Sequence, residues 1–364
     1  MNHSISRWQL VLMVVSFLYG SSFLMAPFLT ASFAYQDAWI SMIISVLIGL
    51  LLNVVWMILM KSYGYQSIFC IMENVGGKWL GTVINLLIVF YAIHIASYVV
   101  RNLSNFMVVS ISPMSSQWTY QIMIVLLAVY SCYYGLNNMA RVNEFLVPWM
   151  LLLFVISVSL AANQFDFSHL RPVFEQSIQS IFQGAYGTIA FPFLDIILLG
   201  SVFTFVKQKE KLMKYYLIGV WFAGMVLILT IVLTLGTQGP YMVIRQSYST
   251  FSMMRDITLI KNFERIEVLI GVFWVFGILV KITLCLFAAL RGLQHISRHK
   301  SYNSFLVPVG ILICVMSNAI HRNTIDFTSW VAKYWTLWWF TLYLILIIMM
   351  IIGKAQKTDY SKIN

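Results

Sequence analysis

Ten apolar stretches, each long enough to cross a lipid bilayer, account for most of this 364-residue chain. A transmembrane helix needs about 20 mainly apolar residues. Backbone polar groups in lipid must bond internally, which allows only helices or closed barrels, and the period-two alternation of barrel strands is absent. We therefore predict an all-α polytopic membrane protein with ten transmembrane helices. The predicted spans are 8–31, 38–60, 79–104, 118–136, 142–162, 184–206, 212–236, 267–290, 303–320 and 333–352.

The spans leave no room for a soluble domain, because 60% of the residues are apolar and only 10% are charged. The stretch 8–31 is too long for the roughly 7–15-residue apolar region of a cleaved signal peptide. We expect residues 1–364 to form a single integral membrane domain.

Positive charge is distributed unevenly between the two sets of loops. With a cytoplasmic N-terminus, fourteen Lys and Arg residues fall inside and seven outside, with Arg101 and Lys281 left within spans. The clusters at 207–214 and 291–300 both fall inside. The positive-inside rule therefore predicts cytoplasmic termini and cytoplasmic loops 61–78, 207–211 and 291–302. The net charge of +11 reflects this bias, so nucleic acid is not an expected partner.

Two predicted spans, the first and the sixth, carry interruptions at matching positions of the two halves of the chain. The first contains Tyr19-Gly20-Ser21-Ser22 with Pro27 further on, and the sixth runs from Gly187 to Pro192. Gly and Pro are common in membrane helices, so one such helix alone would mean little. A matched pair points to a transporter-type site at the bilayer midplane. Because each half has five spans, we predict inverted repeats at about 8–162 and 184–352.

Interrupted helices suit a zwitterionic ligand such as an amino acid. Half-helix N-termini favour a carboxylate, whereas freed carbonyl groups favour an ammonium or a small cation. The residues predicted to bind ligand at the two breaks, or to offer a hydroxyl from the eighth span, are Gly20, Ser21, Ser22, Ala190, Phe191, Pro192, Phe193, Leu194 and Thr283. Threonine often bonds back to its own helix, so Thr283 has that alternative role.

Asp195 and Lys281 are the strong charges that fall inside spans away from the ends. A charge at that depth costs at least about 2.5–3.5 kcal/mol and marks a functional site. The two could pair with each other, Lys281 could take the place of a coupling cation, or either could contact ligand. A purely structural ion pair is the plain alternative. Arg101 lies nearer a span end, and we expect it to snorkel towards the membrane surface.

Nothing in the sequence predicts an enzyme, a cofactor or a metal site. The chain has no P-loop, no HExxH and no GxSxG motif. His94 is expected to be a packed or cavity histidine. The four cysteines lack both metal-site spacing and a disulfide framework, which favours inert packing. They are Cys70, Cys132, Cys285 and Cys314.

The chain resembles the B subunits of endospore germinant receptors, a branch of the amino acid–polyamine–organocation superfamily. The resemblance rests on the Gly20…Pro27 pattern, the Phe191–Asp195 stretch, which is similar to Phe-Pro-Phe-Gly-Glu, and Glu264-Arg265-Ile266-Glu267 before the span with Lys281. Two residues depart from the pattern: Leu194 stands in place of Gly, and Asp195 in place of Glu. Leu194 fills space beside the break, and Asp195 shortens the carboxylate.

The resemblance implies a nutrient sensor in the spore inner membrane or the cell membrane. Such a protein binds a germinant, usually an amino acid, and acts with an A subunit and a lipoprotein C subunit. A proton-coupled amino acid permease is the second interpretation. A structural subunit with an empty site is the third.

Overall fold

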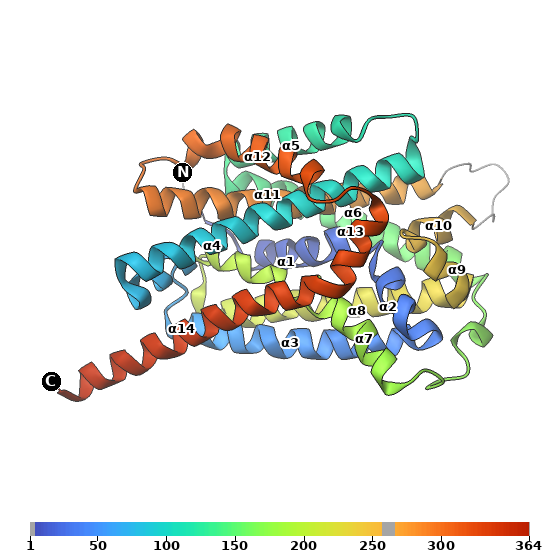
Figure 1. Cartoon of the computed structure of the whole chain (residues 1–364), viewed down its shortest axis with the longest axis horizontal. Helices are drawn as coiled ribbons and strands as arrows, with labels where there is room; N and C mark the ends of the chain where they lie inside the picture. Colours follow the sequence, from blue (N-terminus) through green and yellow to red (C-terminus); the bar gives the residue numbers. More distant parts are fainter. Residues whose placement is uncertain (1–3, 257–265, 364) are drawn as a thin grey trace.

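The computed structural model describes residues 4–256 and 266–363, with side chains described except at 266–270, 272–273 and 357–363, and it is mainly helical (Figure 1). Within these residues a single β-bridge joins Ile5 to Val206. The helices up to residue 162 are α1 (Arg7–Ser22), α2 (Ala26–Ala34), α3 (Ala38–Ser62), α4 (Ile68–Phe106), α5 (Gln117–Tyr134) and α6 (Leu136–Ala162). The later ones are α7 (Ile178–Ile189), α8 (Leu212–Gln238), α9 (Pro240–Arg245), α10 (Ser249–Asp256), α11 (Ile266–Ser297), α12 (Leu306–Ala319), α13 (Thr324–Trp330) and α14 (Thr336–Ile363).

Seven helical stretches in the described part of the chain are long and apolar enough to cross a membrane on their own. The three remaining predicted spans are also helical but shorter or divided. The span 8–31 is split into α1 and α2, and 118–136 is α5, whose ends are rich in Gln and Tyr. The span 184–206 contains part of α7 and two 3₁₀ segments, η4 (Asp195–Ser201) and η5 (Phe203–Phe205).

The first span is interrupted, but directly after the predicted stretch Tyr19–Ser22 and not within it. Tyr19 to Ser22 are still helical in α1, and the turn covers Phe23, Leu24 and Met25. Pro27 follows in the first turn of α2, where its missing N–H costs nothing. The prediction placed the break at Tyr19–Ser22, whereas Gly20 serves helix packing.

The sixth span is interrupted within the predicted stretch, at Ala190–Leu194. Gly187 to Ile189 remain in α7, and the chain then turns and continues as η4. The 3₁₀ segment leaves backbone groups with tighter and poorer hydrogen bonds than an α-helix. Asp195 is therefore the first residue after the break.

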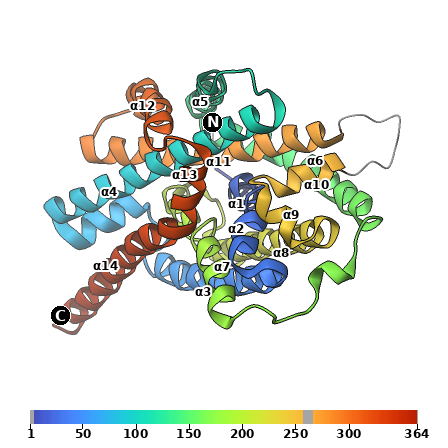
Figure 2. The same cartoon turned by 45° about the vertical axis from the view of Figure 1, so that its right-hand side comes forward.

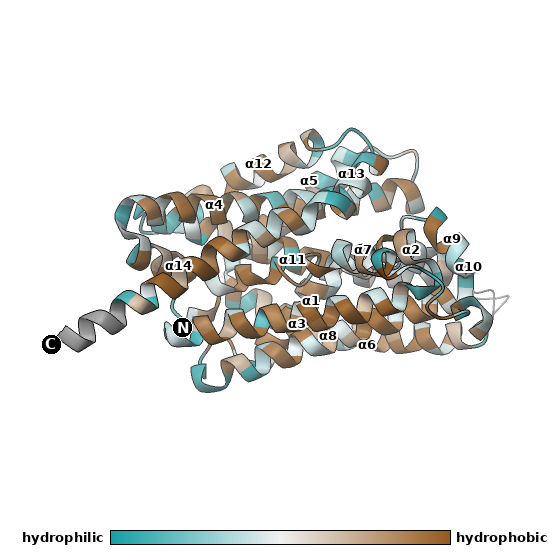
Figure 3. Cartoon of the chain, turned by 60° about the horizontal axis from the view of Figure 1, so that its bottom comes forward, coloured by the Kyte–Doolittle hydropathy of each residue, from teal (hydrophilic) through white to brown (hydrophobic). Residues whose placement is uncertain are grey.

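Helix α1 lies inside the bundle, packed on α6, α8 and α11 (Figure 1). Helix α11 also packs along α4, and α5 and α12 pair on one flank (Figure 2). The sides of the bundle are apolar and teal residues gather towards its ends (Figure 3). Exposed apolar side chains such as Leu126, Phe145, Ile311 and Ile348 fit a lipid-facing surface.

Both termini lie towards the same end of the molecule (Figures 1 and 3). Loops predicted to be cytoplasmic meet there. Lys209 Nζ donates to the carbonyl of Gly64 at 3.3 Å, and His295 Nε2 lies 2.6 Å from the Glu73 carboxylate. The shared end agrees with an even number of crossings. Which membrane face it occupies stays a prediction.

Candidate functional site

Lys281 joins residues that lie beside the two helix breaks. Its Nζ donates to Ser21 Oγ at 2.7 Å and lies 2.9 Å from Asp195 Oδ2. Ser21 stands one residue from the end of α1, and Asp195 opens η4. Both charged side chains are 0% exposed. Of the roles considered for them, the structure realises direct pairing.

Further groups complete the surroundings of this pair. Trp335, in η8 (Val331–Trp335), donates from Nε1 to Asp195 Oδ1 at 3.1 Å. The rings of Phe17 and Phe191 have centroids 4.8 and 5.3 Å from Lys281 Nζ. Ring faces attract a desolvated ammonium, so they partly replace its lost water. Each charge is thus paired and further stabilised, as a buried ion pair requires.

The other predicted hydroxyl groups do not reach the pair. Ser22 Oγ donates to the carbonyl of Leu18 at 2.9 Å, and Thr283 Oγ1 donates to that of Leu279 at 2.7 Å. Both hydroxyls therefore bond back to their own helices. Ser21 is the predicted hydroxyl that meets the charge.

Gly20 is the point of closest approach between α1 and α11. A Cβ atom on Gly20 would lie 2.4 Å from the carbonyl oxygen of Gly277, closer than any side chain permits. The glycine lets the two backbones touch, and this contact sets Ser21 opposite Lys281. Its role in this structure is packing.

The residues of the second break point in different directions. Phe191 faces Lys281, whereas Phe193 packs on Gly49 of α3. The carbonyl of Ala190 accepts from the backbone N–H groups of Leu194 and Asp195, at 3.0 and 3.4 Å. Leu194 and Pro192 are buried. The break is therefore a packed turn in this structure.

Three side chains that sequence reasoning missed also support the breaks. Asn53 Nδ2 donates to the carbonyl of Phe193 at 2.8 Å, and Thr250 Oγ1 donates to that of Phe23 at 3.0 Å. Trp335 is the third. Asn53 is the one amide in the apolar span 38–60, a signal that could have been used. Trp335 gave none, because tryptophans are common near membrane surfaces.

Two cavities open at the end of the bundle that holds the termini. One, of about 350 Å³, lies between the loop after α5 and the ends of η5 and α11, with Phe205 and Arg291 in its wall. The other, of about 540 Å³, is lined by polar groups that include Gln9, Arg141 and Lys207. Asn137 borders both, so they adjoin.

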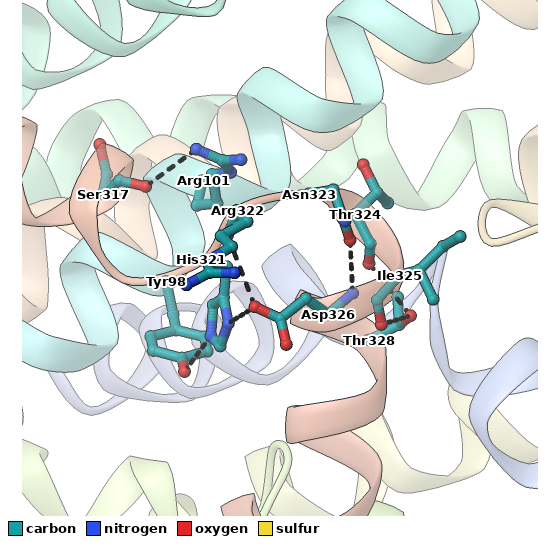
Figure 4. A network of polar contacts seen from close by, with 10 residues as sticks. All are labelled: Tyr98, Arg101, Ser317, His321, Arg322, Asn323, Thr324, Ile325, Asp326 and Thr328. Carbon is teal, nitrogen blue, oxygen red and sulfur yellow. Dashed lines mark hydrogen bonds and ion pairs between the residues drawn. The ribbon is translucent and has the colours of Figure 1, made fainter.

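A polar network links α4 to the segment that joins α12 and α13 (Figure 4). Tyr98 hydrogen-bonds His321 Nε2, and His321 Nδ1 lies 3.2 Å from Asp326 Oδ2. Arg101 joins this region, and the snorkelling prediction for it is wrong. Its side chain is only 5% exposed and bonds Ser317 of α12, because α4 turns this residue towards the other helices.

His94 is packed, as predicted, at 7% exposure between the Phe90 and Trp335 rings. Within the described residues no group of three or more His, Cys, Asp or Glu side chains could hold a metal ion. The four cysteines are free, and only Cys70 is exposed. The Glu264-Arg265 part of the sequence pattern lies outside the described residues.

The fold and the broken helices define a transporter-like membrane protein. MhsT, solved in complex with L-phenylalanine, superposes with a TM-score of 0.66 over 98% of this chain and 99% of that chain, at 12% identity. Mhp1, a nucleobase-cation-symport-1 family transporter solved with bromovinylhydantoin, gives 0.62 over 91% and 75%, at 12% identity.

The chain belongs to the spore germination protein family, whose sequence profile matches residues 4–325. It is 24% identical to spore germination protein KB of Bacillus subtilis (strain 168), over 88% of this chain and 86% of that protein. It is 25% identical to spore germination protein GerQB of Bacillus cereus, over 89% of each. The family predicted from the sequence motifs is confirmed.

Proposed function

We propose that this protein is the nutrient-sensing subunit of a spore germinant receptor and that its germinant is an amino acid. The germinant binds between the break at Phe23–Met25 and the break at Ala190–Leu194. The N-terminus of α2 offers partial positive charge to a carboxylate, and the turn after α7 offers carbonyl groups to an ammonium. Ser21 and Phe191 are the best placed of the predicted ligand residues, because both touch Lys281.

The observation that carries the proposal is the bonding of Lys281 to Ser21 and Asp195, which lie beside the two breaks. A coupling cation must bind and leave in every transport cycle, whereas an ammonium on a side chain stays attached. A fixed cation between the breaks therefore favours a sensor over a cation symporter. Ligand binding would then act by shifting the breaks relative to this pair.

Several broader features belong to the same proposal. Residues 1–364 form one membrane domain with inverted repeats at about 8–162 and 184–352. The termini face the cytoplasm from the spore inner membrane or the cell membrane. The protein works with an A subunit and a lipoprotein C subunit, since a receptor without transport must pass its signal through protein contacts. It has no catalytic role.

A proton-coupled amino acid permease is the alternative, and the likeness to the folds of MhsT and Mhp1 favours it. The two functions differ in what crosses the membrane. Purified protein in proteoliposomes, supplied with a labelled amino acid mixture and a pH gradient, separates them. A sensor gives uptake no greater than protein-free liposomes.

The matching experiment in the spore-forming host deletes the gene and measures germination with each amino acid separately. We expect the response to at least one amino acid to disappear and to return on complementation. We also expect this germination response to require the A and C subunits. Gradient-driven uptake, together with an unchanged germination profile, would establish the permease instead.

A further inference from the structure

Arg101 is a buried cation that contacts no anion among the described residues. Its side chain is 5% exposed, and no described Asp or Glu oxygen lies within 4.0 Å of it. Its two hydrogen bonds both come from Nη1, at 3.4 Å, to the Ser317 carbonyl and Asn318 Oδ1. These are long for a charged donor. Nε is buried and no described group accepts from it, so the described residues do not satisfy the guanidinium.

The nearby carboxylate of Asp326 has other hydrogen-bond partners. Its Oδ2 lies 3.2 Å from His321 Nδ1 and accepts from the backbone N–H of Arg322 at 3.5 Å (Figure 4). Asn323 caps the start of α13, because its Oδ1 accepts from the backbone N–H of Asp326 at 2.8 Å. Asp326 is thus held by other partners and does not compensate the charge of Arg101.

A second donor on the same face of α4 also lacks an acceptor among the described residues. Asn105 lies one turn further along this face, and its Nδ2 is buried without a described partner. The Asn105 amide thus adds a buried donor beside the Arg101 guanidinium.

Water alone does not resolve this arrangement. A water molecule can accept from Nε–H or from the amide, yet it leaves the buried positive charge uncompensated. A carboxylate does both, because its two oxygens match the planar fork of a guanidinium.

We propose that Arg101 anchors a second site, for a small organic carboxylate, where α4 meets α12. Nε–H and a neighbouring Nη–H bind the two carboxylate oxygens, and the Asn105 amide adds a third donor. The site is distinct from the helix breaks and does not rest on the proposed function.

Acetate is the probe that tests this site. Full-length protein in lipid nanodiscs is unfolded by heating, and tryptophan fluorescence reports the Tm. The measurement is repeated as acetate replaces methanesulfonate at constant ionic strength. Methanesulfonate carries the same charge but is not planar at its oxygens. We expect a saturable rise in Tm with acetate. Arg101→Gln should abolish it, and Asn105→Ala should weaken it.

The matched control is Arg245→Gln, which removes an exposed arginine from α9 and should keep the full acetate response. If Arg101→Gln does not fold, Arg101→Lys keeps the charge but loses the fork. It should raise the half-saturating acetate concentration at least about tenfold. A wild-type response that never saturates, or one that is unchanged in the Arg101 variants, overturns the site.

Discussion

The indole N–H of Trp335 donates to Asp195 Oδ1, the carboxylate oxygen that Lys281 does not contact. The tryptophan lies 140 residues from the aspartate along the chain. It satisfies one oxygen while the ammonium satisfies the other, so the carboxylate is held in one orientation. The pair is thereby fixed relative to both helix breaks.

Removing Lys281 should strongly impair the protein. Lys281→Met leaves Asp195 buried without its counter-ion, at a cost of about 3–5 kcal/mol. Because Asp195→Asn removes the stranded charge, the double variant should recover part of the loss. Membrane abundance and Tm measure both effects. A double variant as unstable as the worse single variant would show that Lys281 has a task beyond pairing.

Replacing Trp335 with phenylalanine keeps a ring but removes the donor. We expect Tm to fall. The free energy of unfolding should decrease by about 1.5–3 kcal/mol, because the lost hydrogen bond has a charged acceptor. Trp338→Phe is the matched control, because that ring is 37% exposed and stacks on Tyr91. Equal effects of the two changes would mean that ring volume, and not the hydrogen bond, matters.

Adding one methyl group at Gly20 should separate α1 from α11. Gly20→Ala places Cβ 2.4 Å from the Gly277 carbonyl oxygen, and overpacking typically costs about 1–3 kcal/mol. Gly187→Ala is the control, because its Cβ meets nothing closer than 3.8 Å. We expect a lower Tm and a weaker germinant response for Gly20→Ala alone. An unchanged Tm and germinant response in Gly20→Ala would show that the close contact between α1 and α11 is not required.

Stability should decline in mild acid because of His321, which lies between α12 and α13. Burial lowers the pKa of this imidazole, opposed by Asp326 and reinforced by Arg101. The folded state therefore favours neutral His321. Stability should be full above the ordinary value of about 6.5 and should fall as the pH drops below it. Tm measured from pH 7.5 to 5 checks this, and His321→Gln should flatten the slope.

Orientation can be tested by labelling single cysteines in a variant that lacks the four native ones. Cysteine introduced at Lys209 should resist an impermeant reagent in intact cells, because that loop is predicted to be cytoplasmic. Cysteine at Tyr241, which is 73% exposed in α9 near the opposite end, should react readily. The reverse pattern would invert the topology.

Apolar length and charge determined much of this protein from sequence. Hydropathy reports how deep a residue lies along a helix axis, so the burial of Asp195 and Lys281 was predictable. Pro192 and its neighbours marked the second break correctly. The first break was misplaced, because Gly20 was taken as a helix breaker when it serves a helix crossing, and the chain turns only after Ser22.

Only the tertiary structure determined which partners these buried charges contact. Lys281 meets Ser21 across 260 residues and Asp195 across 86. Such meetings depend on how each helix is rotated about its axis, and rotation is set by packing between helices. Arg101 shows the same limit: its position near a span end suggested lipid and water, yet the facing of α4 buries it. Sequence gives the depth of a charge, and only the packed bundle gives its partner.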